Sequence, residues 1–193
     1  MMLDTLRDEL VKMDNQDQSI RDTLAAEGVL HDGYHPRMAA IHKANAQRLR
    51  DIIDEHGWPV ERLVGPEGAK AAWRIAQHAI GEPEFQRECL RRLSAAAKSG
   101  DVPAWQPAMI EDRIRMFEGR PQLFGTQLEP DDQGIMRPYL IEDPGGVDER
   151  RRAVGLAPLA ERLASAERWP VPADRARYEL EYAEWLRRVG WRL

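Results

Sequence analysis

The sequence has a single cysteine, Cys89, and no apolar run long enough to cross a membrane. One cysteine cannot form an internal disulfide, and an unpaired thiol in a chain of 193 residues suits a reducing compartment. A membrane span needs about 20 consecutive apolar residues, which no segment approaches. The start, MMLDTLRDELVKMD, is charged from its fourth residue and lacks the apolar core of a secretory signal. We therefore expect a cytoplasmic protein with no membrane partner.

Long stretches of one charge are also missing. Acidic and basic residues are interspersed along the chain, and the net charge is only −5. Because no basic stripe stands out, nucleic acid is not an expected partner. The sequence has no Walker loop and no GxGxxG after a strand, so nucleotide cofactors are not expected. It also has no GxSxG elbow and no reactive-cysteine motif, which argues against a covalent serine or cysteine intermediate.

What the sequence does have is helical periodicity. Apolar residues recur every three or four positions from Leu3 to Leu24, which is typical of an amphipathic helix. Similar spacing, punctuated by proline and glycine, predicts helices over about 36–56, 66–80, 83–100, 105–117 and 174–189, with shorter ones in 147–169. Two extended segments around the turn EPDDQ predict a small β-hairpin near residues 122–140. We expect a mainly α, bundle-like fold that forms one helical domain over residues 1–193.

Polar side chains interrupt this apolar pattern in the first helix. Asp17 takes an apolar position between Met13 and Ile20. A buried carboxylate is costly unless it is paired, and Arg21, four residues further on, would be a structural partner. Gln18 lies beside it. A structural Asp–Arg pair and a functional site are both open explanations.

The next two helices repeat the anomaly. In the second helix, Asn45 lies on the apolar face and His42 precedes it by three residues. An asparagine at such a position often specifies how helices pair, whereas the charge of a histidine changes near neutral pH. In the third helix, His78 shares a side with Ile75 and Ala71. A core histidine with satisfied hydrogen bonds is the alternative to a catalytic one.

The fifth expected helix and the segment after it are similarly polar. Asp112 and Arg113 fall among apolar residues of the helix. Gln122, Thr126 and Gln127 then alternate in an extended stretch beside a glycine that permits close backbone approach. Facing helices that project polar groups into one interior commonly form a site. We therefore expect one polar pocket shared by all these segments.

A family resemblance rests on the same residues. The segments that carry it are DNQDQSIR, GWP, AWRIAQH, EDRIRMFEGRPQLFGTQ and VDERRRAVGL. In this order they resemble a widespread bacterial family of unknown function with the pattern DQxxR, GWP, QH, DR, GxxQxYGTQ and RRxxGL, over residues 14 to 160. Phe124 stands where the family usually has tyrosine, so a role for that hydroxyl is in doubt here. The resemblance implies no reaction, but it implies a recurring residue set: Asp17, Gln18, Arg21, His78, Asp112, Arg113, Gln122, Thr126 and Gln127.

The residues favour an enzyme for a small polar or peptide-like substrate. His78 would be the general acid or base, with Asp17 or Asp112 fixing its tautomer. Arginine side chains would bind an anionic group, and amide and hydroxyl groups would hydrogen-bond the rest of the substrate. We therefore expect hydrolysis, cyclisation or elimination, with the catalytic residues His78, Asp112 and Asp17. The expected substrate-binding residues are Arg21, Gln18, His42, Asn45, Arg113, Gln122, Thr126 and Gln127.

Two alternatives remain at this stage. Although no cofactor is expected, His42 and His78 with Asp17 or Asp112 would form a two-histidine, one-carboxylate metal site. His31 and His35 have ligand spacing only if helical, which the glycine and proline around them disfavour. The other alternative is a non-catalytic module that binds a peptide or a protein.

Overall fold

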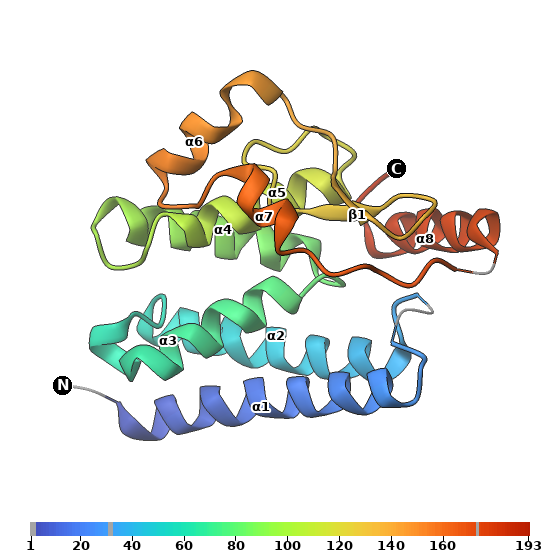
Figure 1. Ribbon diagram of the computed structural model, residues 1–193. Coiled ribbons are helices and arrows are strands. Elements are labelled where there is room, and N and C mark those ends of the chain that lie inside the picture. Colours follow the sequence, from blue (N-terminus) through green and yellow to red (C-terminus); the bar gives the residue numbers. More distant parts are fainter. Residues whose placement is uncertain (1–2, 31–32, 173) are drawn as a thin grey trace. The chain divides into compact units, whose positions relative to one another are not determined.

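The computed structural model describes residues 3–30, 33–172 and 174–193 (Figure 1). Helices dominate these residues, and their strands form one small antiparallel hairpin, so the expected mainly α fold is confirmed. No helix in the described part of the chain combines the length and apolar character needed to cross a membrane. The chain divides into two compact units, Met1–Val102 and Pro103–Leu193, and each is described by itself. That they form a single domain stays a prediction.

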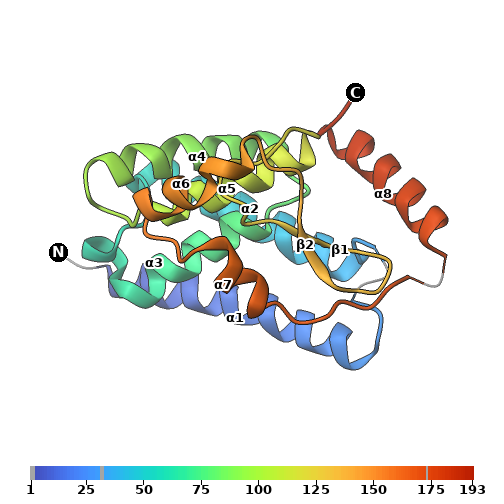
Figure 2. The same cartoon turned by 45° about the horizontal axis from the view of Figure 1, so that its top comes forward.

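The first unit is built from four helices. These are α1 (Asp4–Ala26), α2 (Pro36–His56), α3 (Glu61–His78) and α4 (Pro83–Lys98). α1 packs along α3 and against α2, as both ribbon views show (Figure 2). Side chains that are almost fully buried form its core: Leu10, Leu24, Leu49, Ile52, Val64, Ile75, Phe85 and Leu93. Cys89 is also fully buried.

α3 contains a kink where the sequence predicted a helix start. Gly65 has φ 68° and ψ 171°, and Pro66 follows it inside the helix. Glycine adopts this positive φ without a steric penalty, and proline suits the first turn of the helical segment that resumes after it. The helix begins at Glu61, so one additional turn precedes the predicted start.

The second unit combines helices with the hairpin. α5 (Trp105–Phe117) is followed by β1 (Leu128–Pro130) and β2 (Met136–Pro138), which pair antiparallel with Glu129 opposite Arg137. The 3-10 turn η1 (Pro144–Gly146) leads into α6 (Val147–Ala153), and α7 (Leu159–Ala164) and α8 (Arg175–Val189) follow. The hairpin lies within the predicted range, although each strand has only three residues.

Aromatic side chains pack the end of the chain against α5. Phe117 contacts Trp185 of α8 edge-on, with ring centroids 5.7 Å apart, and Trp191 at 5.1 Å. Tyr182 stacks on Trp185 at 5.8 Å. The aromatic stripe of α8 is therefore packing within this unit, since aromatic pairs at these separations add stability beyond their buried area.

Candidate functional site

Three helices of the first unit bring one acid and two histidines together. Oδ2 of Asp17 in α1 lies 2.9 Å from Nδ1 of His78 in α3. The same oxygen lies 3.3 Å from Nε2 of His42 in α2. One ligand atom from each residue lies within 4.8 Å of the other two. We call these three residues the Asp17–His42–His78 cluster.

The local sequence explains why the cluster forms. Asp17 holds a core-facing position of α1, and His78 is the last residue of α3, which packs along α1. His42 lies on the buried face of α2 with Met38 and Leu49. The side chains of Asp17 and His42 are 1% and 8% exposed, whereas that of His78 is 23% exposed. The cluster is therefore buried on one side and reaches solvent through His78.

The two histidines keep the buried carboxyl of Asp17 ionised. Burial raises the pKa of the Asp17 carboxyl, but contacts with His42 and His78 outweigh burial and hold that pKa well below its usual range. Two buried atoms of the cluster have no hydrogen-bond partner among the described residues. They are Oδ1 of Asp17 and Nε2 of His42. The contact of Nε2 with the other carboxylate oxygen, Oδ2, at 3.3 Å lacks hydrogen-bond geometry. Such atoms are costly unless something else satisfies them.

A tyrosine supports the second histidine. The hydroxyl of Tyr34 lies 2.8 Å from Nδ1 of His42, and the two rings stack with centroids 5.6 Å apart. Burial, reinforced by the negative charges of Asp17 and Glu82, raises the pKa of the Tyr34 phenol, so it stays protonated. The role of Tyr34 was not predictable from the sequence, because a residue in a connection between helices has no periodic pattern to interrupt.

A second ion pair joins the same two helices one turn away. Nη1 of Arg74 in α3 donates to Oδ2 of Asp14 in α1 over 3.0 Å. Arg74 precedes His78 by four residues and Asp14 precedes Asp17 by three, so both pairs link the same helix faces. Burial raises the pKa of the Asp14 carboxyl despite the arginine. The face of α1 that carries Asp17 is therefore polar over more than one turn.

Gln18 and Arg21 extend this polar face of α1. Nε2 of Gln18 is buried and has no hydrogen-bond partner in the described part of the chain. Arg21 is half-buried. Among the residues that the structure describes, the partners of Asp17 are the two histidines. The suggested structural pair between Asp17 and Arg21 is therefore wrong, because the helices that pack on α1 supply the nitrogen atoms instead.

Two buried amides hold the supporting helices in place. Nδ2 of Asn45 in α2 donates to the carbonyl oxygen of Met13 in α1 over 3.3 Å. Nε2 of Gln86 in α4 donates to the carbonyl oxygens of Ala76 and Gln77 over 2.8 and 3.0 Å. Gln86 thereby satisfies two backbone groups at the end of α3, immediately before His78. Its position between Phe85 and Cys89 is another polar interruption of an apolar face, which the sequence analysis passed over.

In the second unit, Asp112 organises a loop. Its carboxylate accepts hydrogen bonds from the backbone N–H groups of Leu123, Phe124 and Thr126 over 2.7 to 3.1 Å. The hydroxyl of Thr126 donates to it as well, over 2.9 Å. Asp112 is fully buried, and these bonds satisfy both of its oxygens. They account for an aspartate at this position without any reaction.

The side chain of Gln122 also binds the loop backbone. Gln122 donates to the carbonyl oxygens of Gln127 and Tyr139 and accepts from the N–H of Gln127. Gly125 between them has φ 65°, and a Cβ there would lie 3.1 Å from Ile141. The groups that approach this glycine closely are the side chains of Ile141 and Leu159, so the expected approach of backbone or ligand stays a prediction. Arg113 is half-buried on α5. The expected pocket shared by all the segments stays a prediction, because the two units are described separately.

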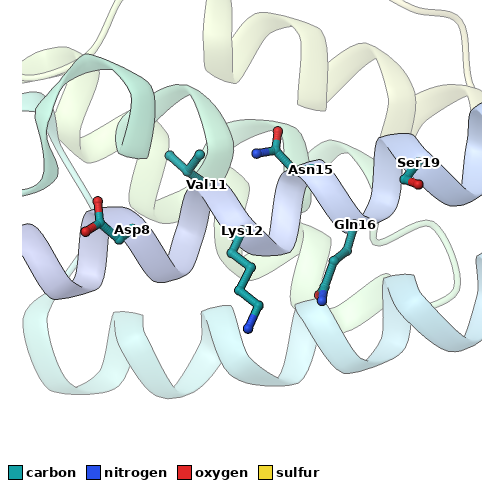
Figure 3. A pocket seen from close by; sticks show the side chains of 6 residues that line it. All are labelled: Asp8, Val11, Lys12, Asn15, Gln16 and Ser19. Atoms are coloured by element: carbon teal, nitrogen blue, oxygen red, sulfur yellow. The ribbon is translucent and has the colours of Figure 1, made fainter.

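Two further features lie outside the cluster. His31 is outside the described residues, and His35 caps α2, where its Nδ1 accepts from the N–H of Arg37 over 3.2 Å. A shallow hollow follows the solvent-facing side of α1 (Figure 3). Its lining is mostly exposed and consists of Asp8, Val11, Lys12, Asn15, Gln16 and Ser19. No residue of the cluster lines this hollow.

The fold and cluster define a helical protein with a buried two-histidine, one-carboxylate centre. Over residues 4–168 the chain matches the model of a family of unknown function, DUF6624, and it belongs to that family. The resemblance noted in the sequence is therefore confirmed, and the matched range extends past the motif blocks at both ends. No curated protein and no solved structure matches the chain.

Proposed function

We propose that this chain is an enzyme for a small polar or peptide-like substrate, with the Asp17–His42–His78 cluster as its reacting centre. The observation that carries this proposal is a buried carboxylate facing two imidazoles, one of which reaches solvent. Hydrolysis, cyclisation and elimination each move a proton, and histidine is suited to proton transfer near neutral pH. The proposed reaction belongs to this group.

The cluster can support proton transfer in two ways. In the first, His78 transfers the proton through Nε2, while Asp17 holds Nδ1 and so fixes the ring and its tautomer. In the second, Asp17, His42 and His78 would hold a metal ion, which would supply Lewis-acid activation of water. Both mechanisms place the chemistry at the same residues. Asp112 has no part in either, because loop hydrogen bonds already occupy its carboxylate.

The polar face of α1 supplies groups for the substrate. Arg21 follows Asp17 by four residues and would bind an anionic group such as a carboxylate. The buried amide of Gln18 would donate a hydrogen bond to the substrate. The contributions of the other expected substrate-binding residues stay predictions: His42, Asn45, Arg113, Gln122, Thr126 and Gln127.

The test compares variants on a mixture of candidate substrates. Wild-type protein, His78→Asn and the control His56→Gln would each be incubated with a bacterial small-molecule extract and analysed by mass spectrometry. His56 is a second histidine of α2, paired with Glu55 outside the cluster. We expect wild type and His56→Gln to deplete the same compound and His78→Asn to leave it unchanged. Equal depletion by His78→Asn would refute the proposal, and no depletion by wild type would favour the non-catalytic binding module.

A further inference from the structure

The spacing of the cluster is that of a metal-binding site. A tetrahedral zinc ion with ligand bonds of about 2.0 to 2.1 Å has neighbouring ligand atoms about 3.3 Å apart. The two distances from Oδ2 of Asp17 are 3.3 Å to His42 and 2.9 Å to His78. The two histidine nitrogens therefore each lie close to the separation from Asp17 that such an ion requires, and all three ligand atoms lie within 4.8 Å of one another.

One tautomer of His42 would also suit a cation between these atoms. In a neutral imidazole one nitrogen donates and the other accepts. If Nδ1 donates to the hydroxyl of Tyr34, then Nε2 presents a lone pair towards the carboxylate oxygen of Asp17. Two acceptors that face each other at 3.3 Å repel unless a positive ion lies between them. The lack of hydrogen-bond geometry in this contact agrees with that arrangement.

The contact between Tyr34 and His42 resembles the hydrogen bond that orients a metal-binding histidine. Histidines that bind metals usually donate their other N–H to an oxygen acceptor, which fixes the ring and the tautomer. In the tautomer in which Nδ1 of His42 donates, the hydroxyl of Tyr34 at 2.8 Å fills that role for His42. Oδ1 of Asp17 is buried without a hydrogen-bond partner in the described residues and is available as a further ligand atom.

We infer that the Asp17–His42–His78 cluster binds one divalent transition-metal ion of the zinc type. Two imidazoles and one carboxylate suit zinc, iron(II), cobalt and nickel, whereas magnesium and calcium prefer sites made of oxygen atoms. Three protein ligands leave a coordination position open, as in catalytic rather than structural zinc sites. The inference deepens the proposed function, because it names the species that acts at the same centre.

The test is a titration of the full-length protein after removal of metal with a chelator. Zinc, cobalt and magnesium would be added separately, with calorimetry for all three and visible absorption for cobalt. We expect wild type and His56→Gln to bind one zinc or cobalt ion per chain and no magnesium. His42→Gln and His78→Gln should lose this binding. Tyr34→Phe should retain it with an affinity about 10- to 100-fold weaker, the usual effect of removing a group that orients a ligand.

Other results would overturn the metal inference or separate it from the proposed enzyme function. Equal zinc binding by wild type and His78→Gln would show an adventitious ion and overturn the inference, as would no binding by wild type. Circular dichroism checks that each variant is folded, and the partly exposed His78 provides a second variant if His42→Gln does not fold. If wild type binds no metal but His78→Asn loses turnover, proton transfer by the imidazole stands and only the metal is refuted. If metal binds and no substrate is consumed, the site stands and the proposed enzyme function fails.

Discussion

Nδ1 of His78 lies 2.9 Å from Oδ2 of Asp17, so the last residue of α3 is fixed to the middle of α1. The residues are 61 positions apart in the sequence, and only the packing of the two helices brings them together. Arg74 and Asp14 repeat the connection one turn away. These two links between α1 and α3 hold the side chain of His78 in place. A site with fixed geometry requires such positioning.

The Asp17 carboxylate should matter for stability. Asp17→Asn replaces a buried carboxylate oxygen that faces two imidazole nitrogens with an amide of the same shape. We expect a loss of about 3 kcal/mol in the free energy of unfolding of metal-free protein, typical of breaking a buried pair. Urea denaturation measures this. The exposed Asp22 on the same helix is the matched control, and Asp22→Asn should stay within about 0.5 kcal/mol of wild type. Equal effects of the two substitutions would contradict the account.

Gln86 should act on the site through α3. Gln86→Leu removes the donor for the carbonyl oxygens of Ala76 and Gln77 and leaves these buried groups without it. We expect a loss of about 1 to 3 kcal/mol in stability and weaker zinc binding, because the end of α3 positions His78. Thermal unfolding and calorimetry measure the two effects. The control, Gln47→Leu, lies on the exposed face of α2 and should change neither. A destabilised Gln86→Leu protein with unchanged zinc affinity would show that Gln86 does not position His78.

Asp112 should affect the stability of the protein but not its zinc binding. Asp112→Asn places an amide against the N–H groups of Leu123, Phe124 and Thr126. We expect it to destabilise the protein by about 3 kcal/mol and to leave the zinc stoichiometry at one ion per chain. Denaturation and metal titration of the same sample measure both. Loss of zinc binding in a folded Asp112→Asn protein would return Asp112 to the site.

Cys89 gives a pH-dependent prediction. Burial raises the pKa of its thiol far above the usual value, so the folded protein keeps the thiol protonated. In the unfolded chain the thiol ionises near pH 8.5, so its contribution to stability is complete below that pH and is lost as the pH rises above it. We expect the free energy of unfolding to fall by about 1.4 kcal/mol per pH unit more in wild type than in Cys89→Ala between about pH 9 and 10. Parallel pH profiles, or rapid reaction of the folded thiol with a thiol reagent, would contradict this burial.

The sequence predicted the helices well because each one carries its own signals. These signals are local: the apolar spacing of α1, Pro36 in the first turn of α2 and Gly57 after α2. The structure places these helices as predicted. The start of α3 was misjudged because proline also suits a helix that resumes after a kink, and Gly65 provides one.

The candidate site was only partly predictable. Asp17, His42 and His78 stood out because each puts a polar group on an apolar face, and the structure brings all three together. Asp112 gave the same signal and instead holds a loop, since periodicity reports burial and cannot identify the partner. Tyr34 gave no signal, because its role depends on where the connection before α2 approaches His42.

The most direct test of the central claim is a crystal structure of the full-length protein grown with zinc, using anomalous scattering at the zinc edge to locate the ion. The account predicts one strong peak about 2.0 to 2.1 Å from Nε2 of His42, Nδ1 of His78 and a carboxylate oxygen of Asp17. The same peak should be missing in crystals of His78→Gln. Zinc found only at other sites, while the ligand atoms of the three side chains still lie within 4.8 Å of one another, would contradict the claim that this cluster is the metal centre.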